Sequence, residues 1–166
     1  EAWQEFCKNI FIIMPRQSKG SLPHNASVHA FRGLITSSAR PSYLAAQTLV
    51  HEGGHNKFSS VLDVFKLYSN ESGEMYYSPF VEDLRPLQNL FHGIFAFLQD
   101  IHISYRLINQ VQEIQGLSIE KYINKLVSKI EQALNIIYKN AILTSHGKQV
   151  VNGCEQALNL ASSFKK

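Results

Sequence analysis

The sequence has only two cysteines and few charged residues, and both shortages limit what the protein can be. Cys7 and Cys154 lie near opposite ends of the chain, and two cysteines do not make the disulfide framework of a small secreted protein. We therefore expect buried free thiols in a cytoplasmic protein. Charged residues make up 17% of the chain and the net charge is only +3, without a dense basic stripe. This composition argues against nucleic-acid binding.

Long apolar runs are also missing. No stretch approaches the roughly 18 apolar residues that indicate a membrane span, so we expect no membrane association. Apolar residues nevertheless make up 45% of the 166 residues, which is typical of a folded domain with a sizeable core. The chain begins at Glu1, without a methionine or a signal-peptide pattern. We interpret residues 1–166 as a single domain, and we expect it to be a piece of a longer protein whose N-terminal region is missing from this sequence.

Hydrophobic periodicity predicts a mainly α protein with a small β element near the N-terminus. A mixed part of strands and loops, residues 1–40, precedes a helical part, residues 41–166. The first part is expected to hold a short helix at 2–9, a strand at 10–15 and a strand or hairpin at 27–38, bent at Gly33. Four helices are expected at about 42–68, 87–111, 119–142 and 149–164, with a polar loop at 69–85 and a break at Gly147. The last two helices can pack within one molecule or against a second chain, as in a homo-oligomer.

The most informative short segment is His51-Glu52-Gly53-Gly54-His55. Residues four apart share one face of a helix, so His51 and His55 can offer two nitrogens to one metal ion. Glu52 lies one step round the helix, where it can address a metal-bound water. Each glycine costs roughly 1 kcal/mol relative to alanine inside a helix. The glycine pair therefore indicates close approach of a substrate, a cofactor or a neighbouring helix.

Two histidines do not complete a metal site, and the sequence offers several third ligands. A metzincin would have glycine and histidine where this chain has Phe58 and Val61, which excludes that class. Glu71 and Glu74 can supply a carboxylate, but their polar loop favours solvated charges. His92 is the better candidate because it lies in the most apolar helix, where a buried imidazole must be hydrogen-bonded or bound to a metal.

The remaining histidines are less suited to the site. His102 lies ten residues after His92 on a different face of the same helix, and we leave it out. His24 and His29 lie in the N-terminal loop and strand region and stay open. His146 precedes Gly147, where capping of a helix C-terminus explains it. Gly93 is expected to let its helix approach the glycines of the first helix.

Three segments occur together in an order that matches a known family. They are FRGLITSS at 31–38, AAQTLVHEGGHNKF at 45–58 and YYSPFVEDLRPLQNLFHGIFAF at 76–97. Over roughly residues 28–107 the chain resembles the HExxH family encoded beside ribosomally synthesised, modified peptides. Members of that family are iron- and 2-oxoglutarate-dependent peptide β-hydroxylases. Typical members carry a Trp-Arg pair after Ser-Pro, where this chain has Phe80-Val81.

The resemblance implies an Fe(II) site held by His51, His55 and His92, with Glu52 as the catalytic residue that tunes the iron environment. A third histidine departs from the common triad of two histidines and one carboxylate. Glu52 and Asp83 therefore remain alternative ligands. The implied substrates are a precursor peptide, O₂ and 2-oxoglutarate.

The distal carboxylate of 2-oxoglutarate needs a cation, and arginine binds carboxylates best. We expect Arg85 to bind it, with Arg32 and Arg40 in reserve, although Arg85 can instead form an ion pair at the helix start. Residues 76–78 can line a peptide groove or pack under their own loop. Asn56 can orient a ligand from outside the coordination sphere.

Two other functions are compatible with the same residues. In a zinc-dependent peptidase or amide hydrolase, Glu52 acts as general base on a zinc-bound water. In a non-catalytic helical binding domain, the histidines are structural, and a folded variant lacking His51 keeps its function.

Overall fold

The computed structural model describes residues 8, 10–17, 25–27, 30–38, 42–114 and 117–163. Its elements are mostly helical, which confirms the mainly α class expected from periodicity. No helix within these residues is long and apolar enough to cross a membrane. The elements in chain order are β1 (Ile12–Arg16), β2 (Ala26–Ser27), β3 (Leu34–Ser38), α2 (Ser42–Val64), β4 (Met75–Ser78), β5 (Asp83–Pro86), α3 (Leu87–Leu107), β6 (Glu113–Ile114), β7 (Leu117–Ser118), α4 (Ile119–Asn140) and α5 (Ser145–Ser163).

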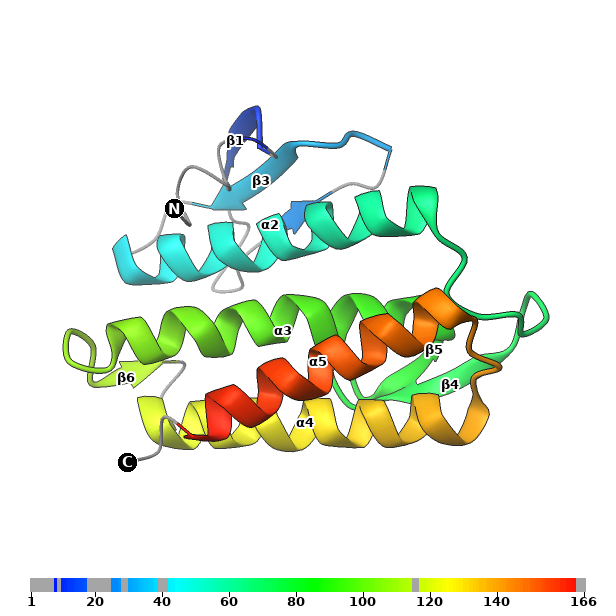
Figure 1. Cartoon of the computed structure of the whole chain (residues 1–166). Helices are drawn as coiled ribbons and strands as arrows, with labels where there is room; N and C mark the ends of the chain where they lie inside the picture. Colours follow the sequence, from blue (N-terminus) through cyan, green and yellow to red (C-terminus); the bar gives the residue numbers. More distant parts are fainter. Residues whose placement is uncertain are drawn as a thin grey trace.

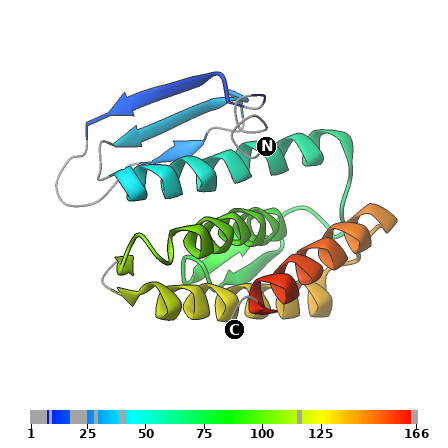
Figure 2. The same ribbon diagram turned by 60° about the vertical axis from the view of Figure 1, so that its left-hand side comes forward.

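The elements are arranged in layers on the two sides of α2. Figures 1 and 2 show the N-terminal sheet on one side of α2 and the helix α3 on the other. Helices α4 and α5 pack against the far side of α3, beside the β4–β5 hairpin. Helix α2, which carries the His-Glu-Gly-Gly-His segment, is thus enclosed between a sheet and a helix.

The N-terminal sheet has three strands in the order β1-β3-β2. Strand β1 pairs with β3 in parallel and β2 pairs with β3 in antiparallel orientation, in the register Ala26↔Thr36. Gly33 has a φ of 81° just before β3, in the left-handed region that favours glycine. The predicted bend at this residue is therefore correct.

The core lies mainly between α3 and α4. Leu90 and Ile94 of α3 and Ile130 and Ile137 of α4 are almost completely buried. Ser118 is the N-cap of helix α4. Its hydroxyl accepts a hydrogen bond from the Lys121 backbone at 3.4 Å, which stabilises the start of the helix. The predicted boundaries of this helix agree with the structure to within two residues.

The segment predicted as a polar loop at 69–85 instead contains the β4–β5 hairpin, so that prediction was wrong. Four residue pairs connect the two strands, from Met75↔Pro86 to Ser78↔Asp83. In the turn, the Glu82 backbone donates to the Ser78 carbonyl at 2.8 Å, and Glu82 has a φ of 56°. The hairpin brings Phe80 and Arg85 towards α2 and α3.

Gly147 was expected to separate two elements, but it lies in the first turn of α5. A Cβ at this position would lie 1.9 Å from the Leu67 carbonyl oxygen. Glycine is present because another backbone segment approaches closely, not because a helix ends. His146 therefore does not cap a helix C-terminus, and its ring packs against Phe65 with the centroids 4.5 Å apart.

Several expectations fall outside the described residues. These are most of the predicted helix at 2–9, Cys7, His24, His29 and Arg40. Cys154 is a buried free thiol, and burial raises its pKa to about 12.

Candidate metal centre

Three histidines from two neighbouring helices lie close to one another. His51 and His55 are one turn apart on α2, and their ring centroids are 4.9 Å apart. His92 comes from α3, and its ring centroid is 5.5 Å from that of His55. The structure therefore brings together the three residues that the sequence suggested as ligands.

Gly54 explains how closely the two helices approach. A Cβ at this position would lie 3.3 Å from the Ala96 Cα and 3.1 Å from the Gln99 Cγ of α3. Close approach of a neighbouring helix, rather than of a substrate or a cofactor, therefore accounts for Gly54. The open side of Gly93 faces the Phe80 ring, 2.3 Å from its missing Cβ position, whereas the open side of Gly54 faces Ala96 and Gln99.

Two of the three ring separations are compatible with one shared ion. With a metal–nitrogen bond of about 2.0–2.1 Å, two imidazoles at roughly 90–110° about a metal place their ring centroids about 4.5–5.2 Å apart. The observed separations of 4.9 and 5.5 Å are close to that range. Within the described part of the chain, no three His, Cys, Asp or Glu side chains already form a metal-binding group. Coordination of one ion by all three histidines therefore requires a change from this arrangement.

An open cleft of about 540 Å³ lies beside the histidines. The sheet, α2, the β4–β5 hairpin and α3 all contribute to its walls. It is lined by every residue that the sequence suggested as a first choice for the site: His51, Glu52, His55, Arg85 and His92. Helix packing and the hairpin bring these residues together from positions up to 41 apart in the sequence (92 − 51).

Burial keeps His55 in the form that binds metals. Its pKa is lowered to about 3, first by burial and then by the positive charges that His51 and His92 can carry. A neutral imidazole has a nitrogen lone pair available at neutral pH. His55 is thus prepared to act as a ligand.

Glu52 is buried between α2 and the sheet, with only 7% of its surface exposed. Burial raises the pKa of its carboxyl group, against the opposing effects of His51 and of hydrogen bonds from the Ser27 side chain and backbone. Strand β2 therefore holds this carboxylate in the wall of the cleft. Such a carboxylate can accept or release a proton beside a metal ion.

Asp100 of α3 is a residue of the site that the sequence reasoning missed. Its Oδ2 lies 3.0 Å from Nδ1 of His51, and only 3% of the residue is exposed. This contact and the charge of Glu52 outweigh the effect of burial and raise the pKa of His51. The sequence did contain a signal that could have identified Asp100. It is one of only three aspartates in the chain, and it lies inside the most apolar helix.

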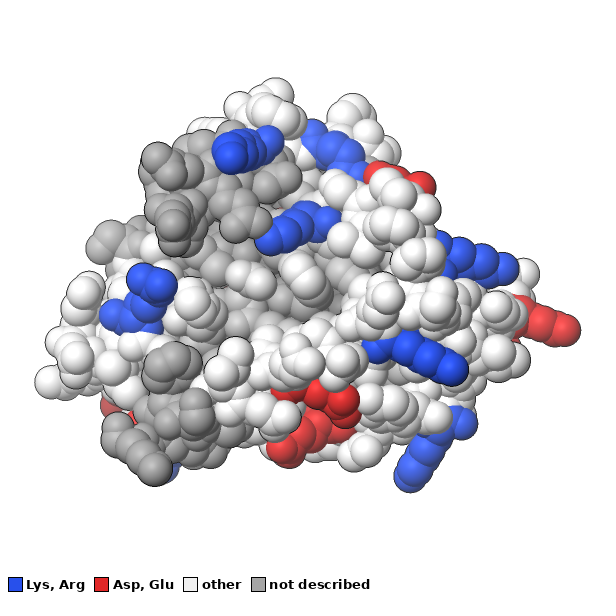
Figure 3. All heavy atoms as spheres, in the orientation of Figure 1, with Lys and Arg blue, Asp and Glu red and all other residues white. Residues whose placement is uncertain are grey.

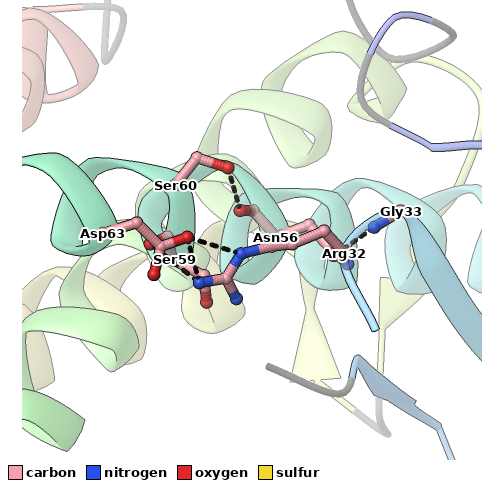
Figure 4. Close-up of polar contacts among 6 residues, drawn as sticks. All are labelled: Arg32, Gly33, Asn56, Ser59, Ser60 and Asp63. Carbon is pink, nitrogen blue, oxygen red and sulfur yellow. Dashed lines mark hydrogen bonds and ion pairs between the residues drawn. The ribbon is translucent and has the colours of Figure 1, made fainter. Parts of the chain in front are cut away.

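Asn56 joins the sheet to α2 and also lines the cleft. Its Oδ1 accepts a hydrogen bond from the Gly33 backbone at 2.9 Å, and its Nδ2 donates to the Glu52 carbonyl at 3.2 Å. Figure 4 shows this amide beside the turn that precedes β3. Asn56 therefore fixes the backbone that carries Glu52.

Arg32, a reserve cation for 2-oxoglutarate, is bound to α2 instead. Its Nε donates to Asp63 at 3.0 Å and its Nη2 donates to the Ser59 carbonyl at 3.2 Å, as Figure 4 shows. Arg32 is not among the residues that line the cleft. The structure thus assigns it a role in attaching the sheet.

Arg85 lines the cleft from β5, and its side chain is 44% exposed. The nearest described carboxylate is Asp83, 3.4 Å away, as expected for the alternative role of Arg85 in an ion pair. Asp83 itself is 64% exposed and does not line the cleft, so it is not a ligand in this arrangement. On the face shown in Figure 3, positive side chains are scattered among uncharged residues.

Most of the other residues suggested for the site lie outside the cleft. Glu71 and Glu74 are exposed, and Glu74 accepts a hydrogen bond from the Tyr76 hydroxyl. Neither Tyr76 nor Tyr77 lines the cleft, whereas Ser78 is buried in its wall. Only the last residue of the expected peptide-groove segment is therefore placed to contact a ligand.

Comparison with known proteins adds no family assignment, because no protein-family model matches the chain and no curated protein is significantly similar to it.

Proposed function

We propose that the protein is an iron- and 2-oxoglutarate-dependent hydroxylase that acts on the β-carbon of a residue in a ribosomally made precursor peptide. The observation that carries this proposal is the group of three imidazoles beside an open cleft that also contains an arginine. Iron supplies the oxidising chemistry when bound: with O₂ and 2-oxoglutarate it hydroxylates a carbon atom and releases succinate and CO₂.

Three neutral imidazoles favour an anionic cosubstrate. His51, His55 and His92 would hold Fe(II) without neutralising its two positive charges. The carboxylate of the 2-oxo acid group would offset one of these charges, and the distal carboxylate would pair with Arg85. Three protein ligands also leave coordination positions open for such a chelating group.

The cleft suits a dicarboxylate and a peptide together. Arg85, which lines the cleft, would bind the distal carboxylate, and the salt bridge to Asp83 that competes with it is exposed and therefore weak. The volume of about 540 Å³ exceeds what a five-carbon dicarboxylate fills, which leaves space for a substrate side chain. The hydrogen bonds of Ser27 hold Glu52 beside this space, and Phe80 and Phe97 form an apolar wall.

The direct test is an anaerobic titration of the full chain with Fe(II) and 2-oxoglutarate. We expect a weak visible absorption band that requires both components. Adding a cognate peptide and O₂ then gives one succinate per hydroxylated peptide. Glutarate, which lacks the 2-oxo group, is the matched control and gives no band. Absence of both the band and succinate formation contradicts the proposal.

Replacing Arg85 with glutamine is expected to raise the KM for 2-oxoglutarate about 10-fold, because a charged hydrogen bond is lost at a half-exposed position. The effect on kcat is expected to be small, since the residue contacts only the distal carboxylate. Arg106→Gln is the control, because Arg106 is on the last turn of α3 and donates to His102 outside the cleft. Equal KM values for the two variants would assign the cation role to another residue.

The second candidate function is zinc-dependent amide hydrolysis, and the raised pKa of Glu52 favours it. In that reaction Glu52 would take a proton from a zinc-bound water. Hydrolysis predicts peptide cleavage without O₂, whereas hydroxylation predicts an intact peptide heavier by one oxygen atom. Mass spectrometry of the peptide product with and without O₂ separates the two.

A further inference from the structure

A buried hydrogen-bonded chain runs from α4 through α3 to the first histidine of α2. Asp100 Oδ2 lies 3.0 Å from His51 Nδ1, and the hydroxyl of Tyr122 donates a hydrogen bond to the same carboxylate. Gln47 in turn donates from its amide to the Tyr122 hydroxyl at 2.6 Å. Gln47, Asp100 and Tyr122 are all buried. Four side chains from three helices are thus linked behind the candidate metal centre.

The contact with Asp100 determines which nitrogen of His51 is available. An ionised carboxylate facing Nδ1 holds a proton on that nitrogen, so in the neutral ring Nε2 carries the lone pair. Nε2 is then the nitrogen that can bind a metal, and the ring is prevented from turning over. Carboxylates commonly act in this way on metal-ligating histidines.

Asp100 is poorly explained as a purely structural residue. Its Oδ1 is buried and has no hydrogen-bond partner among the described residues. An incompletely paired buried carboxylate costs stability, and an apolar side chain would fill the same space without that cost. The chain therefore carries a carboxylate where packing alone favours a hydrophobic residue.

We propose that Asp100 is a positioning residue that holds His51 with Nε2 directed at the metal ion, and that Tyr122 and Gln47 hold Asp100. This inference rests on the metal centre of the proposed function but not on its redox chemistry. A metal ion that binds without any hydroxylation depends on the same orientation of His51.

The test is the affinity of the full chain for Co²⁺, measured by isothermal titration with the wild type and four variants. Asp100→Leu keeps the approximate size but removes the acceptor, and we expect about 10–100-fold weaker binding. Asp100→Asn keeps an acceptor without the charge, so its loss is expected to be smaller. Tyr122→Phe removes the hydrogen bond that holds Asp100 together with the one that Gln47 donates to the same hydroxyl, but it leaves the contact of Asp100 with His51. A loss smaller than that of Asp100→Leu is therefore expected.

Ser104→Ala is the matched control, because Ser104 is one turn further along α3, completely buried, and its Oγ has no partner among the described residues. We expect wild-type affinity from it. A second measurement is the ¹⁵N shift of the His51 ring without metal, where the wild type shows a proton on Nδ1 and Asp100→Leu shows a mixture of tautomers. If Asp100→Leu does not fold, Asp100→Asn provides both measurements.

The outcomes separate this inference from the proposed function. Equal Co²⁺ affinity in the folded Asp100 variants and the wild type, or no binding by any of them, overturns the positioning role. Weaker Co²⁺ binding in the Asp100 variants supports the positioning role. If the wild-type protein also forms no succinate, the hydroxylase is rejected while the positioning role stands.

Discussion

Replacing His55 with alanine is expected to abolish stoichiometric metal binding and with it the activity. His55 is the middle of the three rings, close to both His51 and His92. A four-ligand zinc site contributes roughly 10–16 kcal/mol, so one ligand accounts for about 3–4 kcal/mol, or roughly 10²–10³-fold in Kd. The measurement is a titration with Zn²⁺ or Fe(II), followed by metal analysis after gel filtration.

His102→Ala provides the matched control for this prediction. His102 lies on α3 like His92, but it is exposed and accepts a hydrogen bond from Arg106 at 3.1 Å. Its loss is expected to leave the metal affinity unchanged. If the two variants retain the same metal content, the three-histidine centre is refuted and the histidines are structural.

Replacing Gly147 with alanine is expected to cause a large loss of stability, although it adds only one methyl group. The added Cβ would lie 1.9 Å from the Leu67 carbonyl oxygen and 2.9 Å from its carbon. This carbonyl cannot move freely, because it accepts hydrogen bonds from the Thr144 backbone at 2.9 Å and the Thr144 hydroxyl at 3.2 Å. We expect unfolding to become easier by about 3 kcal/mol, which lowers Tm by roughly 6–12 °C.

Gly153→Ala tests whether this loss arises from the contact or from the helix. Gly153 lies in the same helix, is exposed, and has no atom within 4 Å of its missing Cβ position among the described residues. Alanine there is expected to stabilise the protein by about 0.5–1 kcal/mol. Thermal unfolding of both variants is the measurement. A loss of similar size in both would show that the close contact at Leu67 is absent.

The helices could be predicted because their signals are local. Pro86 stands just before α3, Ser118 caps α4, and both helices carry apolar residues at the spacing of one buried face. The pair His51 and His55 could be predicted for the same reason, since their relation depends only on the helical repeat. For these elements the residue and its partner lie within about one turn, so local chemistry was sufficient.

The hairpin, Gly147 and Asp100 could not be predicted in this way. Pairing of β4 with β5 depends on backbone hydrogen bonds across a turn in which Glu82 has a positive φ, without an Asn-Gly or Asp-Gly signal. Gly147 looked like a helix break because its partner, the Leu67 carbonyl, is 80 residues away in the sequence (147 − 67). Asp100 is 49 residues from His51, and no periodic pattern connects them.

By itself, the sequence determined the helical class of the protein and the two imidazoles on one face of α2, because both follow from a repeat of 3.6 residues. Only the tertiary structure decided that His92 lies beside His55, that Arg85 shares their cleft while Arg32 does not, and that Asp100 faces His51. These relations arise where separate elements pack, and the position of Gly54 at the contact of α2 with α3 is what permits the close approach.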